Sequence, residues 1–267
     1  MDLHRLQPKF AAALGLMTAL TLQAAAAECP RQDALGTSRV MAVDAAATPR
    51  ISAKTLQLGD REVVLTFDDG PSPSTDGQIL AALAEQCVRA TFFLIGKPAS
   101  EHPELARQIA AAGHSVGHHT WSHQNLKVMK PEEAAGEVDK GIAAVETALN
   151  DVSTKTPSTP FFRFPGFLTN QQTLDDLEKR RIAVFNADVI ANDWIPMTQE
   201  AQLKLLTERL KAAGKGIILL HDPQAQTAAV LPDFLRYLRD NRYRVVHVIP
   251  ADAAKATADA AKSEKRE

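Results

Sequence analysis

The sequence is poor in the features that mark several common protein classes. It has two cysteines in 267 residues, at positions 29 and 87, so at most one disulfide can form. It has no excess of positive charge, because 30 Lys and Arg face 32 Asp and Glu for a formal net charge of −2. No basic patch stands out, which makes nucleic acid a poor candidate partner.

The N-terminal segment lacks an apolar run long enough to span a membrane comfortably. Residues 1–9 have a basic lean, residues 10–22 are apolar or small, and residues 25–27 supply an A-x-A cleavage site. This layout predicts a secretory signal peptide over residues 1–27. We therefore expect a secreted or periplasmic protein with no stable membrane insertion after cleavage. An uncleaved N-terminal anchor is the alternative.

Both cysteines remain after that cleavage. An exported chain meets oxidising conditions, which favours a Cys29–Cys87 disulfide that ties the N-terminal segment to the first helix. Two unrelated thiols are the alternative.

Short β-type runs alternate with amphipathic helices from residue 62 onward. Strands are expected at 63–67, 90–95, 161–164, 182–186, 216–220 and 245–249. Helices are expected at 79–87, 103–112, 138–149, 174–179, 203–214 and 232–241, the last beginning at Pro232. Repeated β-α units imply parallel strands covered by helices, in either an α/β barrel or a doubly wound sheet.

Three segments of the mature chain follow from this pattern. Residues 62–250 form the domain, which is long enough for a proper core. Residues 28–61 are expected to be a leader that packs on the domain. Residues 251–267 are rich in Ala, Lys and Glu and are expected to be a flexible tail without an assigned function.

Two adjacent carboxylates, Asp68 and Asp69, follow the strand at 63–67. In parallel α/β architectures, function collects at the carboxyl ends of the strands. Neighbouring carboxylates at the end of a buried strand repel each other unless a cation or a basic side chain neutralises them. The sequence therefore predicts a charged site at this strand end.

Four of the eight histidines fall within residues 113–123. His119 and His123 are four residues apart, so on a helical turn they share one face and can bind one ion. Two imidazoles and one carboxylate, with open positions for water, are typical of a catalytic metal site. An H-x-x-x-H pattern alone is weak evidence, because ordinary surface histidines also produce it.

Other polar residues follow further apolar runs. His221 directly follows the strand at 216–220, and Arg163 and the Asp193-Trp194 pair follow two more runs. A structural salt bridge is the default interpretation of Arg163 taken singly. Polar groups at five strand exits of one domain are hard to attribute to chance.

Five segments resemble, in order, the motifs of the polysaccharide deacetylases, carbohydrate esterase family four, also called the NodB-homology domain. They are residues 66–70, 119–123, 163–166, 188–194 and 220–222. The resemblance covers about residues 62–250. It implies a distorted (β/α) barrel with fewer than eight complete units, and a metal-dependent hydrolase that removes acetyl groups from a polysaccharide.

The resemblance also implies a role for individual residues. The metal ligands are Asp69, His119 and His123. The catalytic residues are Asp68 as general base, Arg163 as its partner, His221 as general acid and Asp193 as the residue that orients this acid. The substrate-binding residues are Gly166, Trp194 and Leu220, with the last two forming an apolar slot for the acetyl methyl group.

Two departures from the family pattern affect these assignments. Gly166 stands where a Tyr is common, so the oxyanion contact is expected from the backbone N–H near Gly166. Ile190 replaces an aspartate often found three residues before Asp193, so either Asp188 or Asp193 remains a candidate for orienting His221.

The donor set fits zinc best, and cobalt or nickel can substitute. The expected partner is an acetylated glycan, which leaves peptidoglycan, chitin-like oligomers, poly-N-acetylglucosamine and acetylated xylan open, with N- or O-acetyl groups. One alternative is an amidase acting on a small non-sugar amide, against which the signal peptide argues. The other is a catalytically inactive carbohydrate-binding protein, which would usually lack a metal ligand or the acid.

Overall fold

The computed structural model describes residue 31 and residues 33–255 of the chain. The predicted signal peptide, Cys29 and most of the predicted tail lie outside these residues. Cys87, which follows the first helix, is disulfide-bonded. Within the described residues, no helix combines the length and the apolarity that crossing a membrane requires.

The ten described strands belong to one sheet, and all of their pairings are parallel. At its centre, β3 (Glu62–Asp68) pairs with β4 (Thr91–Leu94), β9 (Gly216–His221) and β10 (Arg244–Pro250). Beyond β4 the sheet continues through β5 (Ser115–His118), β6 (Phe161–Phe162), β7 (Ala183–Phe185) and β2 (Arg50–Ile51). Two further strands pair with β9 and β10 respectively, β8 (Val189–Ile190) and β1 (Thr37–Val43).

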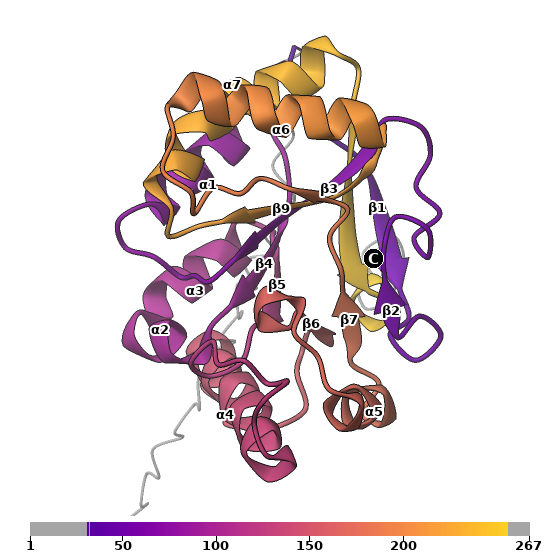
Figure 1. Cartoon of the computed structure of the whole chain (residues 1–267), viewed down its shortest axis with the longest axis vertical. Coiled ribbons are helices and arrows are strands. Elements are labelled where there is room, and N and C mark those ends of the chain that lie inside the picture. The colour runs from indigo at the N-terminus through magenta and orange to yellow at the C-terminus, as the bar shows by residue number, and fades with distance from the viewer. Residues whose placement is uncertain (1–30, 32, 256–267) are drawn as a thin grey trace, which may run out of the picture.

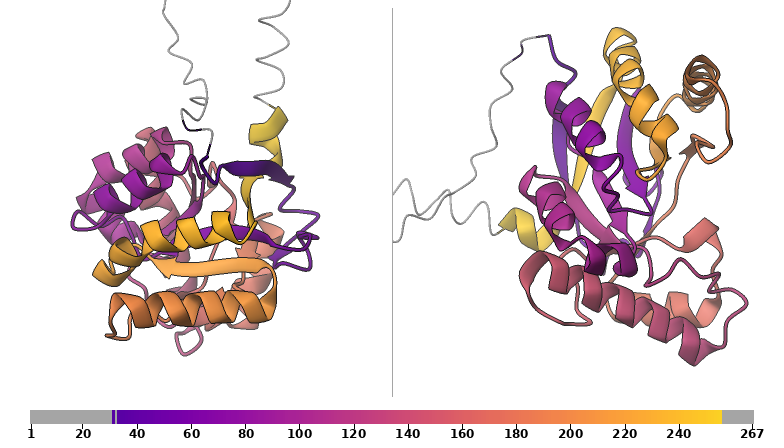
Figure 2. Two further views of the ribbon diagram at one scale, coloured as in Figure 1. Left: turned by 90° about the horizontal axis from the view of Figure 1, so that it is seen from above. Right: turned by 90° about the vertical axis from the view of Figure 1, so that its left-hand side faces the viewer.

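The helices lie along the outside of this curved sheet (Figure 1, Figure 2). One group comprises α1 (Asp76–Glu85), α6 (Gln199–Ala213) and α7 (Ala225–Asp240). A second group comprises α2 (Gly96–Glu101), α3 (Pro103–Ala111) and α4 (Pro131–Asn150). The remaining helices are α5 (Gln171–Lys179) and the short 3₁₀ helix η1 (Pro165–Phe167).

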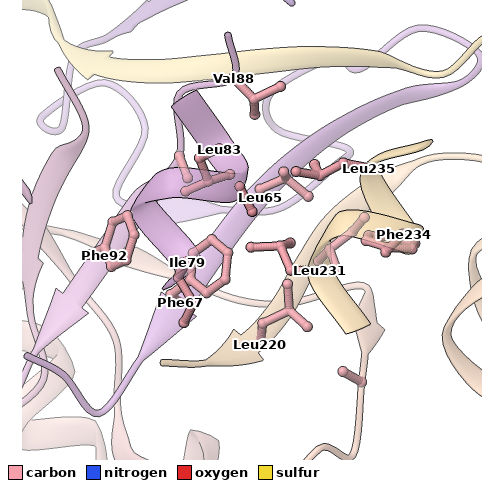
Figure 3. Close-up of a cluster of buried hydrophobic side chains, with 14 of the residues drawn as sticks. Leu65, Phe67, Ile79, Leu83, Val88, Phe92, Leu220, Leu231, Phe234 and Leu235 are labelled. Atoms are coloured by element: carbon pink, nitrogen blue, oxygen red, sulfur yellow. The ribbon is translucent and has the colours of Figure 1, made fainter. Parts of the chain in front are cut away.

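Side chains on the two faces of the strands form separate cores, because successive residues of a strand point to opposite faces. Besides the inner and outer cores there is a smaller cluster around Val138, Phe162 and Leu177. The inner core includes Val64, Phe93, Phe161, Phe185 and Ile217. The outer core lies between the sheet and the helices and includes Leu65, Phe67, Ile79, Leu231 and Phe234 (Figure 3). A parallel sheet with a filled interior and outer helices confirms the predicted distorted barrel.

The barrel is not closed by strand pairing between β2 and β8, among the strands that the structure describes. Asp188 spans this gap, because its Oδ2 atom accepts hydrogen bonds from the backbone N–H groups of Ala53, at 3.2 Å, and Ile217, at 2.8 Å. The segment predicted to pack on the domain thus contributes β1 and β2 to the sheet itself.

Several helices begin earlier than predicted, among them α4 at Pro131 and the last helix. Pro232 was expected in the first turn of a helix, but α7 begins at Ala225 and Pro232 lies inside it. The first two turns bury Ala228, Val230 and Leu231. Burial of this apolar face offsets the hydrogen bond that a proline cannot donate.

Candidate active site

Asp68 is the last residue of β3, and its carboxylate is buried beside a fixed positive charge. Its Oδ1 atom accepts a hydrogen bond from Arg163 Nη1 at 2.7 Å. Its Oδ2 atom lies 3.8 Å from His119 Nε2. The sheet register pairs Asp68 with His221 on β9, so these two side chains start from neighbouring positions. The basic neighbour that the adjacent carboxylates predicted is therefore Arg163.

Arg163 follows β6 and is completely buried. It also donates hydrogen bonds to Thr66 Oγ1 at 2.8 Å and to the carbonyl oxygen of Asn186 at 3.0 Å. Its guanidinium carbon lies 4.4 Å from the centre of the Phe93 ring. Removing one partner of such a buried ion pair leaves an uncompensated charge. Arg163 was interpreted from the sequence either as part of a structural salt bridge or as the partner of Asp68. Both interpretations describe this one contact.

Asp69, His119 and His123 bring their side chains together at the mouth of the barrel. Asp69 Oδ1 lies 3.4 Å from His119 Nε2 and 3.3 Å from His123 Nε2. The three potential ligand atoms all lie within 4.8 Å of one another. Asp69 Oδ1 is buried and accepts no hydrogen bond within the described chain. Two imidazole nitrogens and an orphaned carboxylate oxygen fit a divalent metal ion.

Burial raises the pKa of Asp69, but His119 and then His123 act more strongly in the opposite direction. The resulting pKa of Asp69 is below its ordinary value. Asp69 is therefore an anion at neutral pH, which is the state that a metal ligand requires.

The ring of His119 is held in one orientation. Its Nδ1 atom lies 2.7 Å from the carbonyl oxygen of Arg163. A carbonyl can only accept, so Nδ1 carries a proton, and Nε2 is the ring nitrogen that faces Asp69. Such a backbone contact fixes the tautomer and raises the basicity of a metal-binding histidine.

The predicted helical turn between His119 and His123 is wrong. Strand β5 ends at His118, and residues 119–123 form an irregular loop. Thr120 and His123 adopt left-handed backbone conformations with φ of 67° and 61°. These bends bring the two imidazole rings within 5.1 Å of each other. The sequence spacing indicated two side chains that do come together, but bends of the loop rather than a helical turn bring them there.

His221 ends β9 and contacts Asp193. His221 Nδ1 lies 2.8 Å from Asp193 Oδ1. Asp193 Oδ2 accepts hydrogen bonds from the backbone N–H of His221 at 2.7 Å and from the Thr227 hydroxyl. Asp188, the other candidate, bonds instead to backbone at the opposite end of β9. The contact with His221 therefore belongs to Asp193.

Burial lowers the pKa of His221. The hydrogen bond and the charge of Asp193, followed by the charges of Asp68 and Asp69, outweigh this effect. The pKa of His221 is consequently above its ordinary value, which keeps the imidazolium populated closer to neutral pH.

Two of the three predicted substrate-binding residues lie at the surface beside these groups. Trp194 is 49% exposed, and its ring meets the His221 ring edge-on at 5.2 Å. Gly166 is exposed within η1 and has a φ of 56°. It lies three residues after Arg163 in the chain.

The third predicted substrate-binding residue, Leu220, does not fit that role. It is completely buried in the outer core with Leu231 and Phe234 (Figure 3). Because strand residues alternate between faces, Leu220 points away from the face that carries His221. Leu219 occupies the same face as His221 and is 3% exposed.

Residues 56–184 match the polysaccharide deacetylase family. A chitooligosaccharide deacetylase of Azorhizobium caulinodans is 32% identical over 197 residues, which are 73% of this chain and 90% of that protein. Another chitooligosaccharide deacetylase, of Rhizobium leguminosarum bv. trifolii, is 44% identical over 94 residues, which are 35% of this chain and 44% of that protein. This chain belongs to the polysaccharide deacetylase family.

The structure is also similar to that of the Bdellovibrio bacteriovorus peptidoglycan deacetylase Bd3279. The TM-score is 0.74 at 31% sequence identity, and the match covers 83% of this chain and 61% of that one. The chain thus spans less than half of the Rhizobium leguminosarum relative and under two thirds of Bd3279.

A second carboxylate pair lies behind the site, and sequence reasoning assigned it no role. Asp222 and Asp76 are both completely buried. Burial, and then the charge of Asp76, raise the pKa of Asp222 well above its usual range, while burial raises the pKa of Asp76 to about 6. Asp222 also packs on Gly70, where a Cβ atom would lie 1.7 Å from Asp222 Oδ2. The sequence could have indicated a role for Asp222, because this residue directly follows His221.

Proposed function

We propose that this chain is a metal-dependent deacetylase that removes acetyl groups from an exported, N-acetylglucosamine-containing glycan. One observation carries the proposal. The cluster of Asp69, His119 and His123 lies beside a candidate general base and a candidate general acid. The base is Asp68, which Arg163 binds, and the acid is His221, which Asp193 binds. Location outside the cytoplasm is supported by the signal-peptide pattern of residues 1–27.

We assign Asp69, His119 and His123 as the metal ligands, and zinc suits these donors best, with cobalt or nickel as substitutes. A metal ion bound there supplies Lewis-acid polarisation of the acetyl carbonyl and lowers the pKa of a water molecule to about 7. The protein holds two of these ligands in the state that metal binding requires. The carbonyl of Arg163 orients His119, and the lowered pKa keeps Asp69 ionised.

Asp68 is the proposed general base. Arg163 occupies its Oδ1 atom and holds the carboxylate in place, which leaves Oδ2 directed toward the metal-ligand cluster. A carboxylate in this position removes a proton from the attacking water as the carbon–oxygen bond forms. The guanidinium of Arg163 thus places a positive charge directly beside the proposed base.

His221 is the proposed general acid. Its Nδ1–H donates to Asp193, which leaves Nε2–H of the imidazolium to protonate the departing sugar amine. An amine is a poor leaving group unless it receives this proton. The raised pKa of His221 keeps the acid protonated near neutral pH.

The remaining contacts are assigned to the acetylated sugar. The exposed Trp194 ring offers an apolar surface beside His221. Leu219 replaces Leu220 as the aliphatic wall, because it shares a strand face with His221. The backbone N–H near Gly166 is the proposed donor to the oxyanion, where one such donor contributes about 3 kcal/mol.

The test is acetate release by the purified, processed protein. The substrates are peptidoglycan, chitooligosaccharides, poly-N-acetylglucosamine and acetylated xylan, each assayed with chelator and with added zinc or cobalt. We expect release from at least one N-acetylglucosamine-containing substrate, loss on chelation and recovery with metal. Full turnover by protein shown to be metal-free, or release from xylan alone, would overturn the proposal.

A further inference from the structure

The loop of residues 119–123, called here the ligand loop, lies against one face of α4. Three residues form that face. Lys140 and Gly141 follow Glu137 by three and four positions, so they lie on the same side of the helix as Glu137. Each of them contacts one of the three loop residues between the two histidines. Helix α4 is thus more than a cover for the sheet, because it also holds this loop.

The strongest of these contacts is made by Glu137. Its Oε2 atom accepts a hydrogen bond from the backbone N–H of Ser122 at 2.9 Å. The Ser122 hydroxyl lies 3.0 Å from Oε1 and 3.1 Å from Oε2. One carboxylate therefore binds both donors of the residue that immediately precedes His123. Hydrogen bonds to a charged acceptor are stronger than those between neutral groups.

The two other contacts fix the neighbouring positions. Lys140 Nζ lies 3.8 Å above the Trp121 ring. Gly141 lets the helix approach the loop backbone, because a Cβ atom there would lie only 2.4 Å from the carbonyl carbon of Thr120. The loop is also held by backbone hydrogen bonds from Gly96 to Thr120, at 2.8 Å, and from Lys97 to Trp121, at 2.9 Å.

The ligand loop needs such support because its backbone is strained. Thr120 and His123 both have positive φ, which is uncommon for residues with a side chain and an outlier for a β-branched threonine. Such a conformation persists only where the surroundings hold it. The ring of His119 is anchored to a backbone carbonyl. His123 has a 43% exposed side chain, and its ring has no such anchor within residues 33–255.

We infer that Glu137 is a positioning residue for the metal site, which aims His123 by fixing Ser122. This inference rests on the proposed function, since it assumes a metal ion on Asp69, His119 and His123. Removing the carboxylate should leave the fold intact and let His123 rotate away, so that metal affinity falls. Partners of this outer kind typically contribute about 10–100-fold to affinity.

The experiment measures metal binding itself, without substrate. Metal-free protein is titrated with Zn²⁺ by calorimetry and with Co²⁺ by visible absorption, whose intensity reports the coordination geometry. We expect Glu137→Ala to raise the dissociation constant about 10–100-fold and to change the Co²⁺ spectrum. Glu137→Gln keeps one oxygen acceptor and should bind metal better than Glu137→Ala. Ser122→Ala keeps the backbone hydrogen bond and should show the smallest effect.

Glu132→Gln is the matched control, because Glu132 is an exposed carboxylate on the same helix and no hydrogen bond or ion pair joins it to the ligand loop within the described residues. It should bind metal like the parent protein. Equal dissociation constants for the parent, Glu137→Ala and Glu137→Gln would overturn the inference while leaving the metal site intact. Absence of binding to the parent protein would instead overturn the proposed function. If Glu137→Ala does not fold, the comparison of Glu137→Gln with Glu132→Gln decides.

Discussion

Neighbouring carboxylates at the end of β3 have different surroundings, and these surroundings assign different chemistry to each of them. Asp68 is paired with the buried Arg163, whereas Asp69 faces two imidazoles. A third carboxylate, Asp193, is completely buried and binds His221. At the scale of single residues, function therefore depends on which partner each acid meets. Substitutions that keep the shape and remove the charge test these assignments.

Replacing each carboxylate at the end of β3 in turn should show which one is the general base and which one is the metal ligand. Asp68→Asn should retain the metal and lose about 10²–10⁴ in turnover, because a general base contributes in that range. Asp69→Asn should lose the metal, because a neutral amide is a poor ligand for zinc. Metal content by mass spectrometry and rate constants for acetate release are measured on both variants. The reverse result, with metal lost only from Asp68→Asn, would show that the two roles are exchanged.

The pH dependence of turnover should report His221. A general acid loses activity as pH rises through its pKa, and Asp193 raises that pKa. Asp193→Asn should therefore move the alkaline limb of the rate profile to lower pH, with a smaller loss of maximal rate than His221→Ala. Rates against pH are recorded for the parent protein and both variants. An alkaline limb that stays in place in Asp193→Asn would remove the orienting role from Asp193.

At the scale of elements, Asp188 joins strands that do not otherwise meet. It connects backbone beyond β2 to the first residues of β9. Asp188→Ala should lower the free energy of unfolding by about 1 kcal/mol, because two backbone donors lose their acceptor near the surface. It should leave the pH profile of turnover unchanged, since Asp188 does not contact His221. Denaturant unfolding and the rate profile measure both, and a shifted alkaline limb would contradict this division between Asp188 and Asp193.

At the scale of the whole molecule, three buried histidines that are not proposed metal ligands should make stability fall in acid. Burial lowers the pKa of His114 to about 4, and lowers the pKa values of His118 and His247 to about 3. Between about pH 6.5 and pH 4 the unfolded chain therefore binds protons that the folded chain does not. Stability should fall as pH decreases through this window, by up to about 1.4 kcal/mol per pH unit for each histidine.

His247→Asn should flatten that dependence. Its unfolding free energy, measured with denaturant at several values between pH 4 and pH 7, should have a smaller slope than that of the parent protein. The Asp76–Asp222 pair acts in the opposite direction, since its raised pKa values reduce stability as pH increases. Because this contribution is present in the parent protein and in each variant, it cancels when their slopes are compared. His102→Asn, on a partly exposed side chain, is the control, and equal slopes in all three proteins would refute the prediction.

Local sequence patterns determined the repeating β-α order, the strands that carry the site and the residue types at their ends. Apolar periodicity and strand length depend on neighbouring residues, so they can be read without knowing what a segment packs against. The five motifs also predicted the groups that meet around Asp69. Leu220 shows the limit of this reasoning, because an apolar residue beside His221 looked like part of the site while the alternation of β9 directs it into the outer core.

Tertiary structure alone decided which distant groups became partners. The choice of Asp193 over Asp188 depends on where the chain turns after β8, and the pairing of Arg163 with Asp68 depends on the curvature of the sheet. The sequence showed that His119 and His123 belong together, but a strained loop held by α4 brings them together rather than a helical turn. Such contacts join residues far apart along the chain, and their energies arise only when burial and hydrogen bonding are completed by the whole fold.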